Sequence, residues 1–235
     1  MPLPKLKSAH FGVKLPIMGD ITYRPIYMSE EGAIIQALEL SKDKNDFNEL
    51  MKKLINAASS IDDANKLALS EFIYLTLMIR MKSKGSYVEM IKVCDNPDCK
   101  KKFEFNVDIE DSIKFINPTK VSLLVEVNEG LSLYIKPITI GDYFKRPEDM
   151  NTTDYTIELL SKMVTKAIVD KKSYDVVSPQ ELKENILSRL NQADFKVLNE
   201  KIGDLLNIEV SYEYECPHCH TEYNCTYENP FDFLF

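Results

Sequence analysis

Four of the five cysteines in this 235-residue chain occur as two closely spaced pairs. Cys94 and Cys99 are separated by four residues, and Cys216 and Cys219 are separated by two. Each spacing lets a single turn present two thiolates to one ion, and two such turns supply the tetrahedron that Zn²⁺ prefers. We therefore predict that these four cysteines are the metal ligands of a structural zinc site.

Both pairs are expected at the tips of β-hairpins. Alternating apolar residues precede and follow each pair, which indicates strands on both sides of a turn. We expect a zinc-ribbon-like β unit composed of residues 86–110 and 207–229. The 116 residues of segment 100–215 separate the two pairs. A shared ion would therefore join distant parts of the chain.

Other uses of these residues stay open. A site filled by four thiolates has no position for a substrate or an activated water, so we do not expect an enzyme. A redox Cys-x-x-Cys normally lies at a helix N-terminus, whereas strands surround this one. His218 and His220 lie close enough to replace a cysteine ligand, but we expect them in the turn or in contact with ligands. Cys225 is expected to be a buried strand residue, and unrelated reduced cysteines remain an alternative.

Helices are expected on either side of the first cysteine pair, giving an α+β fold with two helical regions around β-hairpins. Residues 1–20 are predicted to be an irregular arm, and residues 21–85 a helical region. Its helices are expected to contain Ile34 to Leu40, Phe47 to Leu54, and a long segment capped by Ser60 that runs through Leu67 and Phe72 to Gly85.

Residues 111–206 are predicted to be an inserted region between the two halves of the β unit. It is expected to begin with a hairpin over residues 121–138, with Gly130 in its turn. Helices should follow over residues 155–169, 178–190 and 195–205, and Ser178 has the pattern of an N-cap. An aromatic tail, residues 230–235, is expected either to contact a partner or to pack in the core.

Charge argues against several classes of partner. The chain has a formal charge of −8, and residues 207–229 contain five Glu and no Lys or Arg. Such a surface would repel phosphate and anionic membranes, so we expect protein partners, no nucleic acid and no membrane. A zinc-ribbon protein that binds nucleic acid remains the alternative. The sequence contains no nucleotide-binding glycine motif.

Two further segments are similar to a known family. The segment ITYRPIYMSEE at residues 21–31 contains Arg24 and Pro25, and LSEFIYLTLMIRMKSKGS at residues 69–86 contains Arg80, Ser83 and Gly85. Together with the cysteine-containing hairpin that follows, they resemble the baseplate hub assembly proteins of T4-like bacteriophages.

The resemblance implies a non-enzymatic role in tail assembly through contacts with baseplate hub or other tail proteins. The protein would act in the host cytoplasm as a chaperone for hub assembly, or stay in the virion tail as a subunit. The resemblance assigns no binding or catalytic residue.

Overall fold

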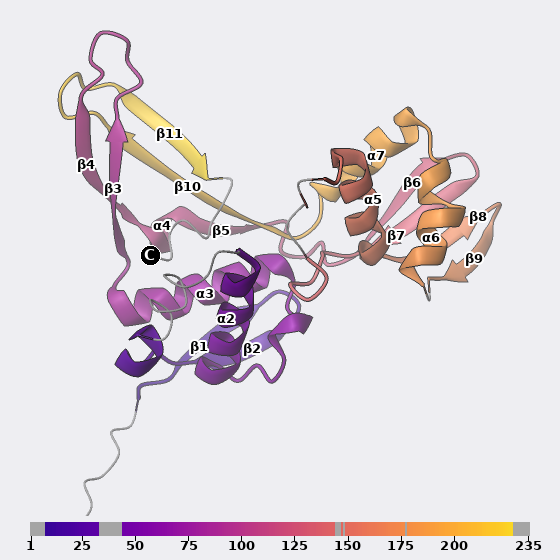
Figure 1. Ribbon diagram of the computed structural model, residues 1–235, viewed down its shortest axis with the longest axis horizontal. Helices are drawn as coiled ribbons and strands as arrows, with labels where there is room; N and C mark the ends of the chain where they lie inside the picture. The colour runs from indigo at the N-terminus through magenta and orange to yellow at the C-terminus, as the bar shows by residue number, and fades with distance from the viewer. Residues whose placement is uncertain (1–7, 33–43, 144–146, 148, 177, 228–235) are drawn as a thin grey trace, which may run out of the picture.

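A computed structural model describes residues 8–32, 44–143, 147, 149–176 and 178–227. Figure 1 shows three parts: a helical part with a small hairpin, two long hairpins that extend away from it and meet at their tips, and a separate group of strands and helices. The predicted α+β class is confirmed. None of the described helices is both long and apolar enough to cross a membrane. The helix expected at Ile34 to Leu40 and the tail at residues 230–235 lie outside the described residues.

The predicted arm over residues 1–20 is wrong in its second half. Strands β1 (Phe11–Leu15) and β2 (Gly19–Tyr23) form an antiparallel hairpin. Gly19 has a φ of +76°, a conformation that glycine adopts without strain. The alternation of the hairpin buries Leu15, Ile21 and Tyr23 against the helices.

Helices α2 (Lys44–Ala58) and α3 (Leu69–Lys84) pack against this hairpin and are joined through a short 3₁₀ turn, Ala64–Lys66. The expected long helix therefore starts later than predicted. Asp63 caps the 3₁₀ turn instead. Leu67 and Ala68 are extended because they pair with the chain near Thr139, where Ile140 N donates to Leu67 O at 2.9 Å. This long-range pairing outweighs the local helix signal.

A buried carboxylate joins α3 to the first hairpin. Glu71 is fully buried, and its Oε1 accepts hydrogen bonds from the backbone N–H groups of Ile17 (2.5 Å) and Met18 (3.1 Å). Its second oxygen has no partner among the described residues. Burial raises the pKa of Glu71 and outweighs the backbone N–H groups of Ile17, Met18 and Ala68, which lower it.

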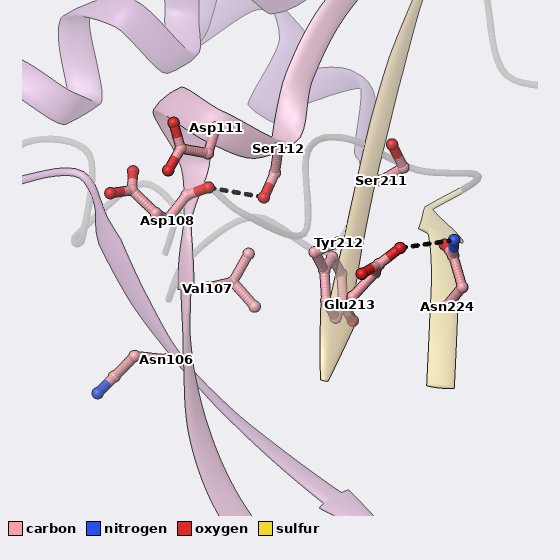
Figure 2. Close-up of a pocket in the computed structure, with 9 residues that line it drawn as sticks. All are labelled: Asn106, Val107, Asp108, Asp111, Ser112, Ser211, Tyr212, Glu213 and Asn224. Atoms are coloured by element: carbon pink, nitrogen blue, oxygen red, sulfur yellow. Dashed lines mark hydrogen bonds between the residues drawn. The ribbon is translucent and has the colours of Figure 1, made fainter. Parts of the chain in front are cut away.

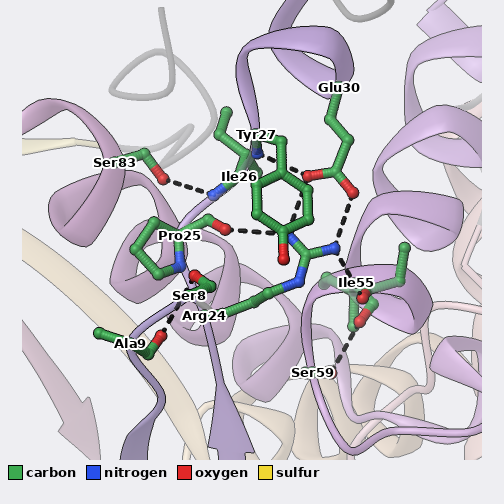
Figure 3. A network of polar contacts seen from close by, with 11 residues as sticks. Ser8, Ala9, Arg24, Pro25, Ile26, Tyr27, Glu30, Ile55, Ser59 and Ser83 are labelled. Carbon is green, nitrogen blue, oxygen red and sulfur yellow. Dashed lines mark hydrogen bonds and ion pairs between the residues drawn. The ribbon is translucent and has the colours of Figure 1, made fainter. Parts of the chain in front are cut away.

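The residues that carry the family resemblance hold these elements together (Figure 3). The Arg24 guanidinium forms two hydrogen bonds to Glu30, at 2.9 and 2.7 Å, and lies 4.0 Å above the Tyr27 ring. Ile26 N donates to the Ser83 hydroxyl at 3.0 Å, which links this segment to the end of α3. These contacts hold the segment after β2 against the end of α3.

The end of α3 leads directly into the first long hairpin. Gly85 caps the helix with a φ of +94°, as its position in the sequence predicts. Arg80 donates to the carbonyl oxygens of Gly85 (2.5 Å) and Tyr87 (3.2 Å). The helix end and the first residues of the hairpin are therefore fixed to each other.

Two long hairpins form the β unit. Strands β3 (Tyr87–Val93) and β4 (Lys102–Asp108) pair as predicted, and so do β10 (Asn207–Glu215) and β11 (Glu222–Tyr227). After the short helix α4 (Ile109–Ser112), strand β5 (Ile113–Ile116) adds to β10. Residues 113–116, predicted to belong to the insertion, thus complete the sheet of the second hairpin.

The remaining part contains a four-stranded antiparallel sheet in the order β6-β7-β8-β9. Its strands are β6 (Leu123–Asn128), β7 (Leu131–Ile135), β8 (Val164–Val169) and β9 (Lys172–Asp175). The first two form the predicted hairpin. The helix predicted over residues 155–169 is partly wrong: α5 (Thr152–Met163) ends before β8. Pairing with β7 selects a strand for VTKAIV, whose β-branched residues suit a sheet.

Two further helices cover this sheet (Figure 1). Helix α6 (Pro179–Asn185) begins as predicted, with the Ser178 hydroxyl accepting from Glu181 N at 3.3 Å. It ends earlier than expected, and a 3₁₀ turn, Leu187–Arg189, follows. Helix α7 (Gln192–Ile202) ends before Leu205. Leu182, Leu187 and Leu198 are buried in the core of this part.

Candidate metal centre

The tips of the two long hairpins bring the four predicted ligands together. One ligand atom from each of Cys94, Cys99, Cys216 and Cys219 lies within 4.8 Å of the others. The Sγ atoms of Cys94 and Cys219 are 3.6 Å apart, and those of Cys99 and Cys216 are 3.8 Å apart. A tetrahedral Zn²⁺ with Zn–S bonds of about 2.3 Å requires Sγ–Sγ edges of about 3.8 Å. The four sulfurs therefore fit a metal ion of this size.

The two cysteine turns have the same backbone construction. Cys94 N donates to Lys101 O at 2.9 Å, and Cys216 N donates to Thr221 O at 3.0 Å. In each turn the residue after the second cysteine has a positive φ, +47° at Lys100 and +55° at His220. In each turn the backbone thus folds back so that both thiols of a pair point to one side. Because neither residue is a glycine, the residue type that usually signals a positive φ, the sequence does not indicate this turn.

The longer first turn depends on Asn96. The backbone oxygen of Asn96 accepts from Cys99 N at 3.0 Å and from Lys100 N at 3.2 Å, and its side-chain oxygen accepts from Asp98 N at 3.0 Å. These bonds compact a loop with two more residues than the Cys216 turn. Asn96 was not among the predicted site residues, although its Asn-Pro context is typical of turns.

Polar side chains connect the two turns around the sulfurs. The Tyr223 hydroxyl lies 3.2 Å from Cys94 Sγ and accepts from Asn96 N at 3.0 Å. The Thr221 hydroxyl lies 3.2 Å from Cys219 Sγ and accepts from Asn96 Nδ2 at 3.3 Å. Both were missed from the sequence. Their positions two and four residues after Cys219, where the chain leads into β11, are the signal that could have identified them.

The thiols differ in acidity because of these contacts. Hydrogen bonds from the Thr221 hydroxyl and backbone N–H lower the pKa of Cys219 to about 6. The Lys101 backbone N–H lowers the pKa of Cys99, but burial and the three neighbouring thiols outweigh it and raise the pKa to about 11. Four adjacent thiols cannot all ionise without a compensating cation. The electrostatics thus favour a bound cation.

An aromatic layer supports the site between the hairpins. The Phe105 and Tyr214 rings stack with centroids 4.6 Å apart, and Tyr214 stacks on Tyr223 at 5.1 Å. Phe103 packs against both Phe105 and Tyr214. Cys94 and Cys216 are buried at the end of this layer. The apolar contact and the cysteine cluster hold the same two hairpins together.

The other candidate ligands lie outside the group of four. His218 and His220 are exposed, and His220 Nδ1 pairs with Glu215 Oε1 at 2.5 Å. Cys225, predicted to be buried, is half-buried because it lies on the edge strand β11. Its Sγ accepts from Lys92 Nζ at 3.5 Å.

The surface at the base of the two hairpins, away from the cysteine tips, is acidic. Figure 2 shows a hollow between the two hairpins and α4, where carboxylates come from Asp108, Asp111 and Glu213. The rest of its lining is polar or neutral and contains no Lys or Arg. Asn224 Nδ2 donates to Glu213 Oε1 at 3.4 Å across the second hairpin. This arrangement disfavours phosphate and anionic surfaces.

Comparison with known proteins identifies one family. The model of the family described as T4 bacteriophage base plate protein matches residues 8–235, nearly the whole chain. No curated protein and no solved structure matches.

Proposed function

The chain belongs to the T4 bacteriophage base plate protein family, and from this membership we propose that it is a non-enzymatic structural or assembly protein of the baseplate hub. It acts through contacts with other tail proteins. The family match over residues 8–235 carries the proposal. The acidic hollow of Figure 2 supports protein partners over nucleic acid.

The metal in this proposal is zinc, held by the four cysteines. An all-sulfur set with Sγ–Sγ separations of 3.6 and 3.8 Å suits a closed, tetrahedral structural site. When bound, zinc would supply a fixed charge that keeps the thiols ionised. Four protein ligands leave no position for a substrate, which supports a structural use of the metal over a catalytic one.

We call this arrangement the zinc clasp: the four cysteines and the two hairpin tips that carry them. The clasp joins β3–β4 to β10–β11, although segment 100–215 lies between the ligand pairs. The aromatic layer holds the hairpins together along their length, and the clasp fixes their ends. The protein would thereby present a rigid pair of hairpins for assembly.

Purification from infected cells, combined with metal analysis, tests this proposal. We expect one zinc per chain, an X-ray absorption spectrum with four sulfur ligands, and co-purified tail proteins. Recovery without tail proteins would contradict the assembly role, whereas a spectrum with nitrogen or oxygen ligands would contradict the clasp. Tight, salt-sensitive binding to DNA or RNA would favour a nucleic-acid function instead.

Mass spectrometry of purified virions separates the two forms of the proposal. A stoichiometric amount of the protein in virions indicates a retained subunit of the tail. Its presence in infected host cytoplasm and absence from virions indicates a chaperone that leaves after assembly.

A further inference from the structure

The outward face of β3 carries an exposed apolar row. Tyr87, Ile91 and Val93 are 65%, 55% and 53% exposed, and Glu89 lies between them in the same row. The alternate residue Val88 is buried, as the strand period requires. The row is therefore apolar surface that the fold itself does not use.

The backbone of the same residues faces an open edge. Ile109 N donates to Ser86 O and Cys94 N donates to Lys101 O, both at 2.9 Å, so these opposed pairs are hydrogen-bonded pairs of the hairpin. Alternation directs the backbone groups of residues 87, 89, 91 and 93 away from β4. Arg80 donates to the Tyr87 carbonyl. In the described ranges of the chain, no strand pairs with this edge of β3.

Other free edges of the two hairpins are polar. The outward residues of β4 are Lys102, Glu104, Asn106 and Asp108. Those of β11 are Glu222, Asn224 and Thr226. Charged and polar residues on an edge strand hinder pairing with another chain, and an apolar edge lacks this protection. Exposure does not explain why the outward row of β3 is apolar and those of β4 and β11 are polar, because the residues of all three rows face outward.

Charge indicates what kind of strand fits there. Glu104 lies opposite Ile91 and Asp108 lies opposite Tyr87, with Lys102 opposite Val93. Together with Glu89, the face carries three carboxylates and one ammonium group. The whole chain has a formal charge of −8. A second copy would therefore bring like charges to the edge, whereas a segment with Lys or Arg among its apolar residues would complement it.

We propose that the open edge of β3 is a docking site for an extended segment of another tail protein. That segment adds as a strand beside Glu89, Ile91 and Val93. On the face that carries these side chains, it places apolar residues beside Ile91 and basic residues near Glu89 and Glu104. Backbone hydrogen bonds supply affinity, and the apolar row supplies register. The inference rests on the proposed function, because the occupant is a tail protein.

A photo-cross-linking amino acid placed at position 91 tests the site in infected cells. A matched control places it at Thr226, on the polar edge of β11. We expect position 91 to cross-link to one extended, basic segment of a tail protein at least about tenfold more than position 226, with the products mapped by mass spectrometry. Cross-links to a second copy, or to residues 228–235 of the same chain, would overturn the proposal.

Proline tests the backbone part. Ile91→Pro removes an N–H that faces the open edge and no bond to β4, so the hairpin should retain its zinc. Recovery of the partner should fall at least about tenfold, while Thr226→Pro should leave it unchanged. If Ile91→Pro fails to fold, Ile91→Lys tests the apolar row without altering the backbone. Unchanged recovery for the folded variant overturns the docking site, whereas wild-type protein without tail proteins contradicts the proposed function itself.

Discussion

The two hydrophobic cores of the molecule are assembled in different ways. The core that contains Leu133 and Leu198 is built from residues 123–205, a single stretch of chain. The core that contains Phe72 combines residues from the range 11–115, together with Ile140 and Tyr143, with residues from the range 208–225, and it includes Cys94 and Cys216. We call the core around Phe72 the first core and the core around Leu133 the second core. The second core thus forms within a local segment, whereas the first core requires the return of a distant segment.

This difference explains where a metal is useful. Closing a long loop costs conformational entropy before distant contacts form. The zinc clasp lies where the two distant segments meet, at the end of the aromatic layer. The stretch 123–205 contains no cysteine and has its own sheet and helices. Metal binding should therefore stabilise the first core and leave the second largely unchanged.

Loss of a ligand should have the largest effect. Zinc contributes on the order of 10 kcal/mol in isolated zinc modules, and Cys216→Ser should remove much of such a contribution. We expect hydrogen exchange to accelerate in β3, β4, β10 and β11 while residues 123–205 retain their protection. Cys225→Ser, outside the group of four, is the control. Equal loss of protection in both cores would contradict the comparison.

A cavity in the second core should have the opposite distribution. Leu133 is fully buried in β7, so Leu133→Ala should lower the free energy of unfolding of this part by about 2–5 kcal/mol. Zinc affinity should not change. Leu124→Ala, at an exposed position of the neighbouring strand, is the matched control. Denaturation followed by hydrogen exchange, together with zinc titration, measures both quantities.

Removal of a hydroxyl beside the sulfurs should have a smaller effect. Tyr223→Phe loses the contact with Cys94 Sγ and the acceptor for Asn96 N but keeps the ring stack with Tyr214. We expect zinc affinity to fall about tenfold, the lower end for contacts that orient metal ligands. Competition with a chelator measures the affinity. Tyr87→Phe should leave it unchanged, and an equal loss in both variants would count against a role for the hydroxyl.

The smallest effect concerns pH within the first core. Burial raises the pKa of Glu71 above its ordinary value of 4.5, so the folded state favours the protonated carboxyl. Its contribution to stability is fully present below pH 4.5 and is lost as pH rises through the folded pKa. Glu71→Gln keeps an oxygen for Ile17 and Met18 and should remove this dependence, with a difference on the order of 1 kcal/mol at pH 7. If the free energies of unfolding of the wild-type protein and of Glu71→Gln changed in parallel with pH, the idea would be wrong.

Local signals predicted several elements correctly from the sequence. The paired cysteines and the alternating strands beside them placed both hairpin tips, because short spacing and side-chain period are properties of a few adjacent residues. Ser178 and Gly85 marked a helix start and a helix end for the same reason. These features need no distant partner to be recognised.

The tertiary structure decided what depends on distant partners. Val164–Val169 becomes β8 because it pairs with β7, and Leu67 lies outside α3 because it bonds to Ile140. Likewise, β5 joins β10 across the insertion. The sequence by itself determined which residues can bind a metal. The fold determined that their sulfurs meet, with Asn96, Thr221 and Tyr223 around them, because only long-range packing brings the two hairpin tips together.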